Sequence, residues 1–197
     1  MELKNLNAQQ TAQIYSSLLV HDFPADERKP LKMILDAMAQ GKYRCIGIFE
    51  GEALRGYAFF VTLEQNGQPE ILLDYYAIVQ AYRGGGIGSA FLRQIPSLFP
   101  EAGAVLIEAE TPEAADTEAE KMIRERRIRF YERCGCKNSG IRAAVFGVDF
   151  NLIQMPVGRL YSAHEICQIF ASIYQKLLPE SVYHSKIVIY HIGKRIL

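Results

Sequence analysis

The residue types best suited to chemistry gather around a glycine-rich connection between an apolar run and a helical pattern: Gly84-Gly85-Gly86-Ile87-Gly88. Glycines let the backbone turn its N–H groups toward one point without obstruction by Cβ atoms. At the start of a helix, such amides form a binding site for an anion. Arg83 before the glycines and Ser89 after them add a guanidinium and a hydroxyl donor. The sequence therefore predicts a phosphate-binding loop over 83–89, the alternative being a flexible loop with an incidental arginine.

Three acids stand near the same connection in the chain. Asp74 lies inside the apolar run 71–79, and Glu108 and Glu110 close a second apolar run at 104–110. A carboxylate within an apolar strand is costly unless it is partnered or used. We therefore prefer Asp74 to Glu108 as a functional acid; the alternative for all three is a solvated strand end or a structural ion pair.

Two well-known phosphate-binding loops, the Walker loop and the dinucleotide-binding loop, do not fully match this glycine-rich sequence. A Walker loop needs a Gly-Lys-Ser or Gly-Lys-Thr sequence, and no such lysine is present. A dinucleotide fingerprint is nearly matched by Gly84, Gly86 and Ser89, with Glu108 at a suitable distance downstream. However, a Rossmann loop turns directly after its strand, whereas four residues separate Val79 from the first glycine. A nucleotide-dependent oxidoreductase is therefore disfavoured.

The elements that must position these residues form a mixed α/β succession. A strand over 2–6 precedes a helix over 8–20 capped by Asn7, and Asp26 is expected to cap a second helix that contains Pro30 and ends at Gly41. Three runs rich in β-branched and aromatic residues, separated by tight-turn signals, then predict an antiparallel meander: 43–50, 54–64 and 71–79.

After the glycines, a helix, a strand and a second helix predict a parallel β-α-β crossover attached to the meander: 89–99, 104–110 and 117–134. The stretch 140–155 supplies one or two more strands. Pro156-Val157-Gly158 marks a boundary, beyond which a helix over 164–178 and a strand over 186–192 follow. We expect a main domain at 1–156 and a helix-strand extension at 157–197. Three roles stay open for the extension: it covers the functional site, extends the sheet or forms a homodimer contact.

Composition excludes several classes of protein. The 197 residues are 49% hydrophobic, enough for a sizeable core, and 22 basic against 22 acidic residues give no net charge. A protein that coats nucleic acid or an anionic membrane needs an excess of Lys and Arg. The basic residues of 121–133 are read as ion pairs and solvated helix surface. Nucleic acid and membrane are therefore not expected partners, and the sequence indicates a soluble cytoplasmic protein.

The four cysteines indicate neither a disulfide framework nor a metal site. They are few for this length, which suits a reducing compartment. Cys134 and Cys136 form a CxC pair, but no second pair of Cys or His stands at zinc-ligand spacing from it. We expect no bound metal.

Arg83-x-x-Gly86-x-Gly88, after a strand and before a helix, resembles the acyl-CoA signature of the GNAT superfamily of acetyl-CoA-dependent N-acetyltransferases. The sequence Phe130-Tyr131-Glu132-Arg133-Cys134-Gly135 is similar to the helix end typical of that family. The order of elements from 2 to about 155 is also similar. The resemblance implies a GNAT-type fold, in which an antiparallel meander joins a parallel β-α-β crossover in a mixed central sheet flanked by helices.

The resemblance also implies roles for individual residues. The amides of the loop would hold the pyrophosphate of acetyl-CoA, and backbone groups of two strand residues would meet its pantetheine arm: Arg83, Gly84, Gly85, Gly86, Ile87, Gly88 and Ser89, with Ile78 and Val79. Asp74 takes the position of a general base, with Glu108 as its rival. Tyr131 takes that of a general acid, or packs on the helix face. Arg124 replaces an asparagine that often contacts CoA, and Cys136 replaces an aromatic residue.

The activity implied is direct transfer of an acetyl group from acetyl-CoA to a primary amine. We expect this amine to belong to a small molecule. Seven acids and no basic residue between 101 and 120 suggest a cationic acceptor, a solvated loop being the alternative. Two other functions stay open: a protein or peptide acetyltransferase acting on a lysine or an N-terminus, and a non-catalytic acyl-CoA-binding module.

Overall fold

The strands form one mixed sheet in the computed structural model, which describes residues 1–191, 194 and 195. Over these residues nine strands lie in the order β1-β2-β3-β4-β5-β7-β6-β8-β9. Their bounds are β1 Glu2–Asn5, β2 Tyr43–Glu50, β3 Ala53–Gln65, β4 Gln68–Ile78, β5 Ala104–Glu110, β6 Lys137–Val145, β7 Val148–Pro156, β8 Ile187–His191 and β9 Lys194–Arg195. β4 and β5 pair in parallel, and the other neighbouring pairs are antiparallel. The predicted meander and crossover are confirmed.

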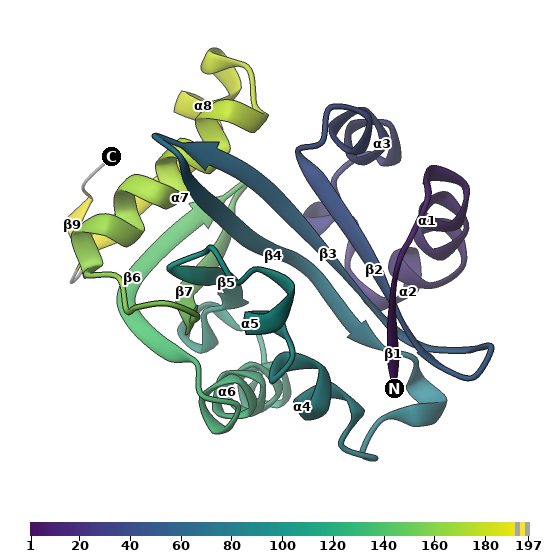
Figure 1. The fold of residues 1–197 in the computed structure, drawn as a ribbon. Helices are drawn as coiled ribbons and strands as arrows, with labels where there is room; N and C mark the ends of the chain where they lie inside the picture. The colour runs from purple at the N-terminus through teal and green to yellow at the C-terminus, as the bar shows by residue number, and fades with distance from the viewer. Residues whose placement is uncertain (192–193, 196–197) are drawn as a thin grey trace.

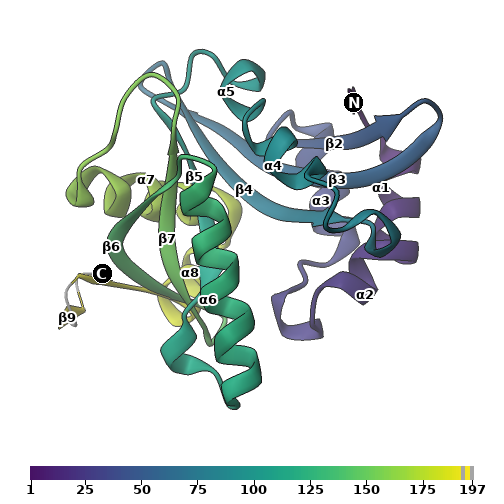
Figure 2. The same cartoon turned by 90° about the horizontal axis from the view of Figure 1, so that it is seen from below.

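Helices cover both faces of this sheet (Figures 1 and 2). Their bounds are α1 Ala8–Ile14, α2 Val20–Asp22, α3 Leu31–Ala39, α4 Ile87–Leu92, α5 Ile95–Leu98, α6 Glu118–Arg133, α7 Ala163–Leu177 and α8 Glu180–Lys186. One apolar core, which we call the α7-side core, joins α1, α3, α7 and α8 to the sheet. The other, the α6-side core, joins α4, α5 and α6 to the opposite face. Figure 2 shows α6 in front of β5 and β7, with α7 and α8 behind them.

The N-terminal helices differ from the prediction in one respect. Asn7 caps α1 with a reciprocal capping box, as expected, and a π-helical segment, Tyr15–Leu19, continues it into α2. Asp26, however, caps no helix, and the expectation that it does is wrong. It lies in a 3-10 turn, Ala25–Glu27, and α3 begins only after Pro30. Proline disfavours a helical residue before it, and the Lys29 N–H donates to the Tyr75 hydroxyl over 2.7 Å instead.

The helix predicted over 89–99 is in fact two short helices. α4 already starts at Ile87, and Pro96 occupies the first turn of α5. Proline has no N–H to continue the hydrogen-bond ladder of α4, so the helix breaks before it. The helix α6 agrees with the prediction, with Thr117 as its N-cap and Cys134 as its C-cap.

Residues after Pro156 build on the same sheet. The side chains of Phe170, Ile173 and Tyr174 in α7 are fully buried in the α7-side core. β8 pairs with β6 in antiparallel register, so the extension lengthens the sheet beyond the crossover. The predicted strand ended at Ile192, which lies outside the described residues. The short helix α8 was not predicted.

Candidate active site

The strands β4 and β5 pair over a short stretch and then separate. Their parallel register covers only Ile71–Leu73 against Val105–Ile107. Beyond it β4 continues to Ile78 beside β3, whereas β5 continues to Glu110 beside β7. A bulge marks the parting, because Phe59 pairs with Tyr75 and Phe60 with Leu73, which leaves Asp74 as the extra residue. The edge of β4 after Leu73 therefore has backbone groups that β5 does not pair.

A cavity of about 750 Å³ occupies this opening. Its walls include Tyr131 and Ile87 from the α6-side core and Phe150 and Tyr174 from the α7-side core. The cavity thus connects the two faces of the sheet where the two strands part. A ligand on one face can meet a ligand from the other face there.

The glycine-rich loop forms one end of the cavity. Gly84 and Gly86 have φ of +84° and +79°, a left-handed conformation that favours glycine. The first hydrogen bond of α4 runs from Ala90 N to Gly86 O over 3.0 Å. The amides of Ile87, Gly88 and Ser89 therefore have no acceptor within the helix. The loop therefore presents three amides without helical acceptors at the start of α4; their binding of an anion stays a prediction.

Close packing continues beside this loop. A Cβ atom at Gly88 would lie 2.8 Å from the Tyr76 hydroxyl and 3.3 Å from the Phe130 ring. The Tyr76 hydroxyl is buried and has no hydrogen-bond partner among the described residues. Such an atom commonly indicates a missing partner. Ile78 lines the cavity, whereas Gly85 and Val79 are not among the described residues that line it.

The two arginines predicted to meet a phosphate have protein partners. Arg83 Nε donates to Ile78 O over 2.8 Å, and its guanidinium pairs with Asp22 at 2.7 Å. Arg83 thereby ties the loop to the end of β4. Arg124 pairs with Glu110 at 2.9 Å and donates to Thr111 O, and it does not line the cavity. Arg127, which also pairs with Glu110, does line it.

Asp74 is held in a structural cluster. Its side chain is 2% exposed; one oxygen accepts from Lys29 Nζ at 2.5 Å, and the other accepts from the Tyr43 hydroxyl. Burial opposes the charge on Lys29, but Asp74 outweighs it and raises the pKa of that ammonium. Both carboxylate oxygens of Asp74 are therefore occupied. This arrangement matches the alternative of a structural ion pair.

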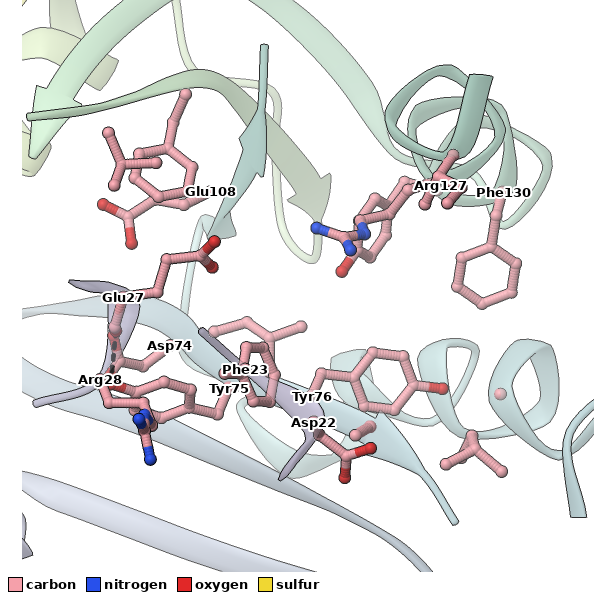
Figure 3. Close-up of a pocket in the computed structure, with 18 of the residues that line it drawn as sticks. Asp22, Phe23, Glu27, Arg28, Asp74, Tyr75, Tyr76, Glu108, Arg127 and Phe130 are labelled. Carbon is pink, nitrogen blue, oxygen red and sulfur yellow. Dashed lines mark hydrogen bonds between the residues drawn. The ribbon is translucent and has the colours of Figure 1, made fainter. Parts of the chain in front are cut away.

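Glu108 faces the cavity from β5 (Figure 3). Burial raises the pKa of its carboxyl to about 7, an effect that Asp74 reinforces, whereas Lys29 and a hydrogen bond from Tyr174 oppose it. The Tyr174 hydroxyl donates to Glu108 Oε1 over 2.7 Å. A carboxyl with this pKa near neutral pH can both take up and release a proton.

Glu27 is a second acid with a perturbed pKa at the same place. Burial raises the pKa of Glu27 to about 7, and the nearby Glu110 adds to that effect. Figure 3 shows the carboxyl groups of Glu27 and Glu108 in the same part of the cavity. The sequence did not predict Glu27, because it lies in a polar turn without periodicity. Tyr174 lies within the helix predicted over 164–178, for which the sequence predicted no functional residue.

Tyr131 lies on the other side of the opening. It is buried, lines the cavity from α6, and packs at a ring distance of 5.6 Å from Phe130. Burial raises the pKa of Tyr131 to about 12, so its hydroxyl is protonated at neutral pH. The structure therefore brings Tyr131, Glu108 and Asp74 to one cavity, in which Asp74 already accepts hydrogen bonds from Lys29 and Tyr43.

Comparison with known proteins decides the family. The model of the acetyltransferase (GNAT) family matches residues 9–136. The chain belongs to the GNAT acetyltransferase family. It is accordingly an acyltransferase, and the fold resemblance inferred from the glycine loop is confirmed. No curated protein matches the chain in sequence.

Solved structures agree with this GNAT fold. A GNAT-family protein from Bacteroides thetaiotaomicron has a TM-score of 0.61 and 19% identity, over 85% of this chain and 92% of that one. Arabidopsis thaliana Naa50, in complex with the bisubstrate analogue CoA-Ac-MVNAL, has a TM-score of 0.57 and 17% identity, over 78% and 97%. An aminoglycoside 6'-N-acetyltransferase complexed with coenzyme A has a TM-score of 0.58 and 14% identity, over 80% and 97%. At these identities the likeness concerns the fold.

Within the described residues, no helix combines the length and the hydrophobicity needed to cross a bilayer.

Proposed function

We propose that this protein transfers the acetyl group of acetyl-CoA directly to a primary amine of a small molecule. One observation carries the proposal. The parting of β4 and β5 creates a cavity with an anion-binding loop at one end and a carboxyl of pKa about 7, Glu108, at the parting itself. Acetyl transfer requires a site that binds the phosphates of the thioester substrate and a base that accepts a proton from the amine. The cavity offers both.

The loop and the end of β4 would hold acetyl-CoA. Amides of the loop, from Gly84 to Ser89, suit its pyrophosphate, and the unpaired edge of β4 up to Ile78 and Val79 suits the pantetheine arm as an added strand. The tight contact at Gly88 and the partnerless Tyr76 hydroxyl support close approach of a ligand there. Acetyl-CoA would supply a thioester carbonyl that an amine can attack.

Glu108 is the base in this proposal, in place of the Asp74 preferred from sequence. An amine is mostly protonated at neutral pH and must lose a proton before it attacks. Glu108 lines the cavity and has a pKa suited to accepting that proton. Asp74 instead accepts hydrogen bonds on both oxygens. Its part is to hold Lys29 in place.

Tyr131 is the acid in this proposal. A departing thiolate is stabilised by a proton donor, and the Tyr131 hydroxyl is protonated at neutral pH. Tyr131 lines the cavity from α6, across from Glu108, so the proposed proton donor and the proposed proton acceptor are separate groups. Figure 3 shows the neighbouring residue Phe130 on that helix. Arg124 has no part in this proposal beyond its ion pair with Glu110.

Calorimetry with acetyl-CoA tests the proposal, followed by assay of CoA-thiol release with a panel of amines. Gly86→Glu should abolish binding, because a carboxylate then enters the anion site. Gly51→Glu is the matched control, since Gly51 has a similar φ of +60°, also has open space around it, and lies in the β2–β3 turn.

Four outcomes would contradict the proposed function. Absence of acetyl-CoA binding to the wild-type protein, or equal binding by both glycine variants, removes the acyl-CoA site. Binding without release of CoA thiol on any amine or peptide would instead favour a non-catalytic acyl-CoA-binding module. Turnover confined to peptides would favour a protein acetyltransferase.

A further inference from the structure

The acceptor end of the cavity has a mainly apolar wall on the α7 side of the sheet. Its side chains come from the segment before α3, from α3 itself, from the β6–β7 hairpin and from the C-cap of α7. The apolar ones are Phe23, Met33, Phe146, Val148, Phe150 and Leu178. Phe23, Val148, Phe150 and Leu178 belong to the α7-side core or pack against it, whereas α4, which follows the glycine loop, packs in the α6-side core. An amine that reaches the cavity from the α7 side therefore meets this surface. The inference below rests on the proposed function.

Phe146 stands out in this wall. It occupies the turn between β6 and β7, with a φ of +51°, and its residue is 46% exposed. A left-handed conformation is unfavourable for a residue with a Cβ atom. Its N–H donates to Lys186 O over 2.9 Å, which fixes the turn. The turn thus holds an exposed aromatic ring at the cavity wall in a conformation that glycine or asparagine would adopt more easily.

Charges at this end favour one ammonium group. Glu27 and Glu108 form no ion pair with a described residue. The neighbouring cations are already engaged: Lys29 pairs with Asp74, and Arg28 donates to the carbonyls of Pro24 and Val20. Asp26 also lines the cavity, but it is exposed, so Glu27 and Glu108 are the two acids withdrawn from solvent that can hold a single ammonium group.

The acidic stretch 101–120 does not add to this charge. Glu110 pairs with Arg124 and Arg127, and Glu113 pairs with Arg142 at 3.1 Å. Among the described residues that line the cavity, Glu108 is the sole member of that stretch. The further positive charges of a polycation would therefore find no second acid of this stretch in the cavity.

We propose that the acceptor is a primary monoamine with an apolar substituent, aliphatic or aromatic. Its ammonium lies between Glu27 and Glu108, and its substituent packs against Phe146 and the neighbouring apolar wall. Phe146 is then a residue that determines specificity.

Steady-state release of CoA thiol, with acetyl-CoA saturating, tests this proposal on matched amines. Hexylamine and phenylethylamine represent the apolar class; ethanolamine, spermidine and an aminoglycoside represent the polar and polycationic classes. We expect kcat/KM for the apolar amines to exceed that for ethanolamine by at least about ten-fold, the usual discrimination of an apolar pocket.

Variants at two exposed apolar residues locate the effect. Phe146→Asn accepts the left-handed backbone but removes the ring, so kcat/KM for phenylethylamine should fall about ten-fold and that for ethanolamine should change little. Leu160→Ala is the control, because Leu160 is 55% exposed and does not line the cavity. It should leave both values unchanged.

The outcomes separate the two levels of the argument. If acetyl-CoA binds, three results overturn the assignment of the acceptor. These are a preference for polar or polycationic amines, no turnover of apolar amines, and equal losses of kcat/KM for phenylethylamine and ethanolamine in Phe146→Asn. Failure to bind acetyl-CoA overturns the proposed function itself. A selective loss for phenylethylamine supports the assignment.

Discussion

The hydroxyl of Tyr174 donates a hydrogen bond to the carboxyl of Glu108 over 2.7 Å. These residues lie 66 positions apart, Glu108 in β5 and Tyr174 in α7. The family match ends at residue 136, so Tyr174 comes from a part of the chain beyond it. A helix that follows the crossover therefore supplies a positioning residue for the proposed base.

Replacement of Tyr174 by Phe should shift the pH dependence of activity. Glu108 must be ionised to accept a proton, so kcat/KM rises as pH increases through its pKa, about 7. The hydrogen bond from Tyr174 lowers that pKa, and its loss should move the acidic limb upward by about one pH unit. Tyr183→Phe, a buried tyrosine of α8 that does not line the cavity, is the control. An unmoved limb in Tyr174→Phe would contradict this role.

Glu108→Gln should lose activity and gain stability. Removal of a general base lowers kcat by about 10²- to 10⁴-fold. In the folded protein the raised pKa of Glu108 favours the neutral form, so wild-type stability decreases as pH rises from about 4.5 toward 7. A neutral glutamine avoids this loss. Urea denaturation at pH 8 should show a variant more stable by about 1 to 3 kcal/mol, with a smaller difference at pH 5. Unchanged kcat would instead remove Glu108 as the base.

Asp74→Asn should mainly affect stability. Lys29 is 15% exposed at its side chain, and loss of its partner leaves a nearly buried ammonium unpaired. Breaking such a pair from one side costs about 3 to 5 kcal/mol. Urea denaturation at pH 7 measures the change. The double variant Lys29→Met with Asp74→Asn removes both charges and should recover much of the stability; no recovery would show that the pair is not the cause.

The sequence predicted the frame of the site better than its chemistry. The strands over 43–50 and 104–110 agree with β2 and β5 residue by residue, because β-branched and aromatic runs between glycine turns fix them locally. A glycine turn after β4 was also predicted, since glycines at positive φ are a local requirement of the turn, although α4 already begins at Ile87 inside the predicted loop 83–89.

The choice between Asp74 and Glu108 depends on contacts that no local pattern contains. A bulge at Asp74 lets its carboxyl meet Lys29 and Tyr43, which are 45 and 31 positions away. Sequence reasoning correctly found a buried acid there, but it could not show that the acid already had partners. Pro30 likewise determines where α3 begins, and Pro96 separates α5 from α4. Neither boundary was predicted from the sequence.

Glu27→Gln should weaken acceptor binding more than it slows the reaction. A hydrogen bond between an ammonium and a carboxylate contributes about 1.5 to 3 kcal/mol, so KM for an apolar amine should rise about 10- to 100-fold with little change in kcat. Because the pKa of Glu27 is raised to about 7, KM of the wild type should fall as pH increases through that value, and this dependence should weaken in the variant, where Glu108 alone still titrates beside the ammonium. Steady-state kinetics from pH 6 to 8.5 measure both effects. Glu52→Gln, an exposed acid in the β2–β3 turn, should behave as the wild type. A decrease in kcat at constant KM would assign Glu27 to proton transfer instead of to binding the ammonium.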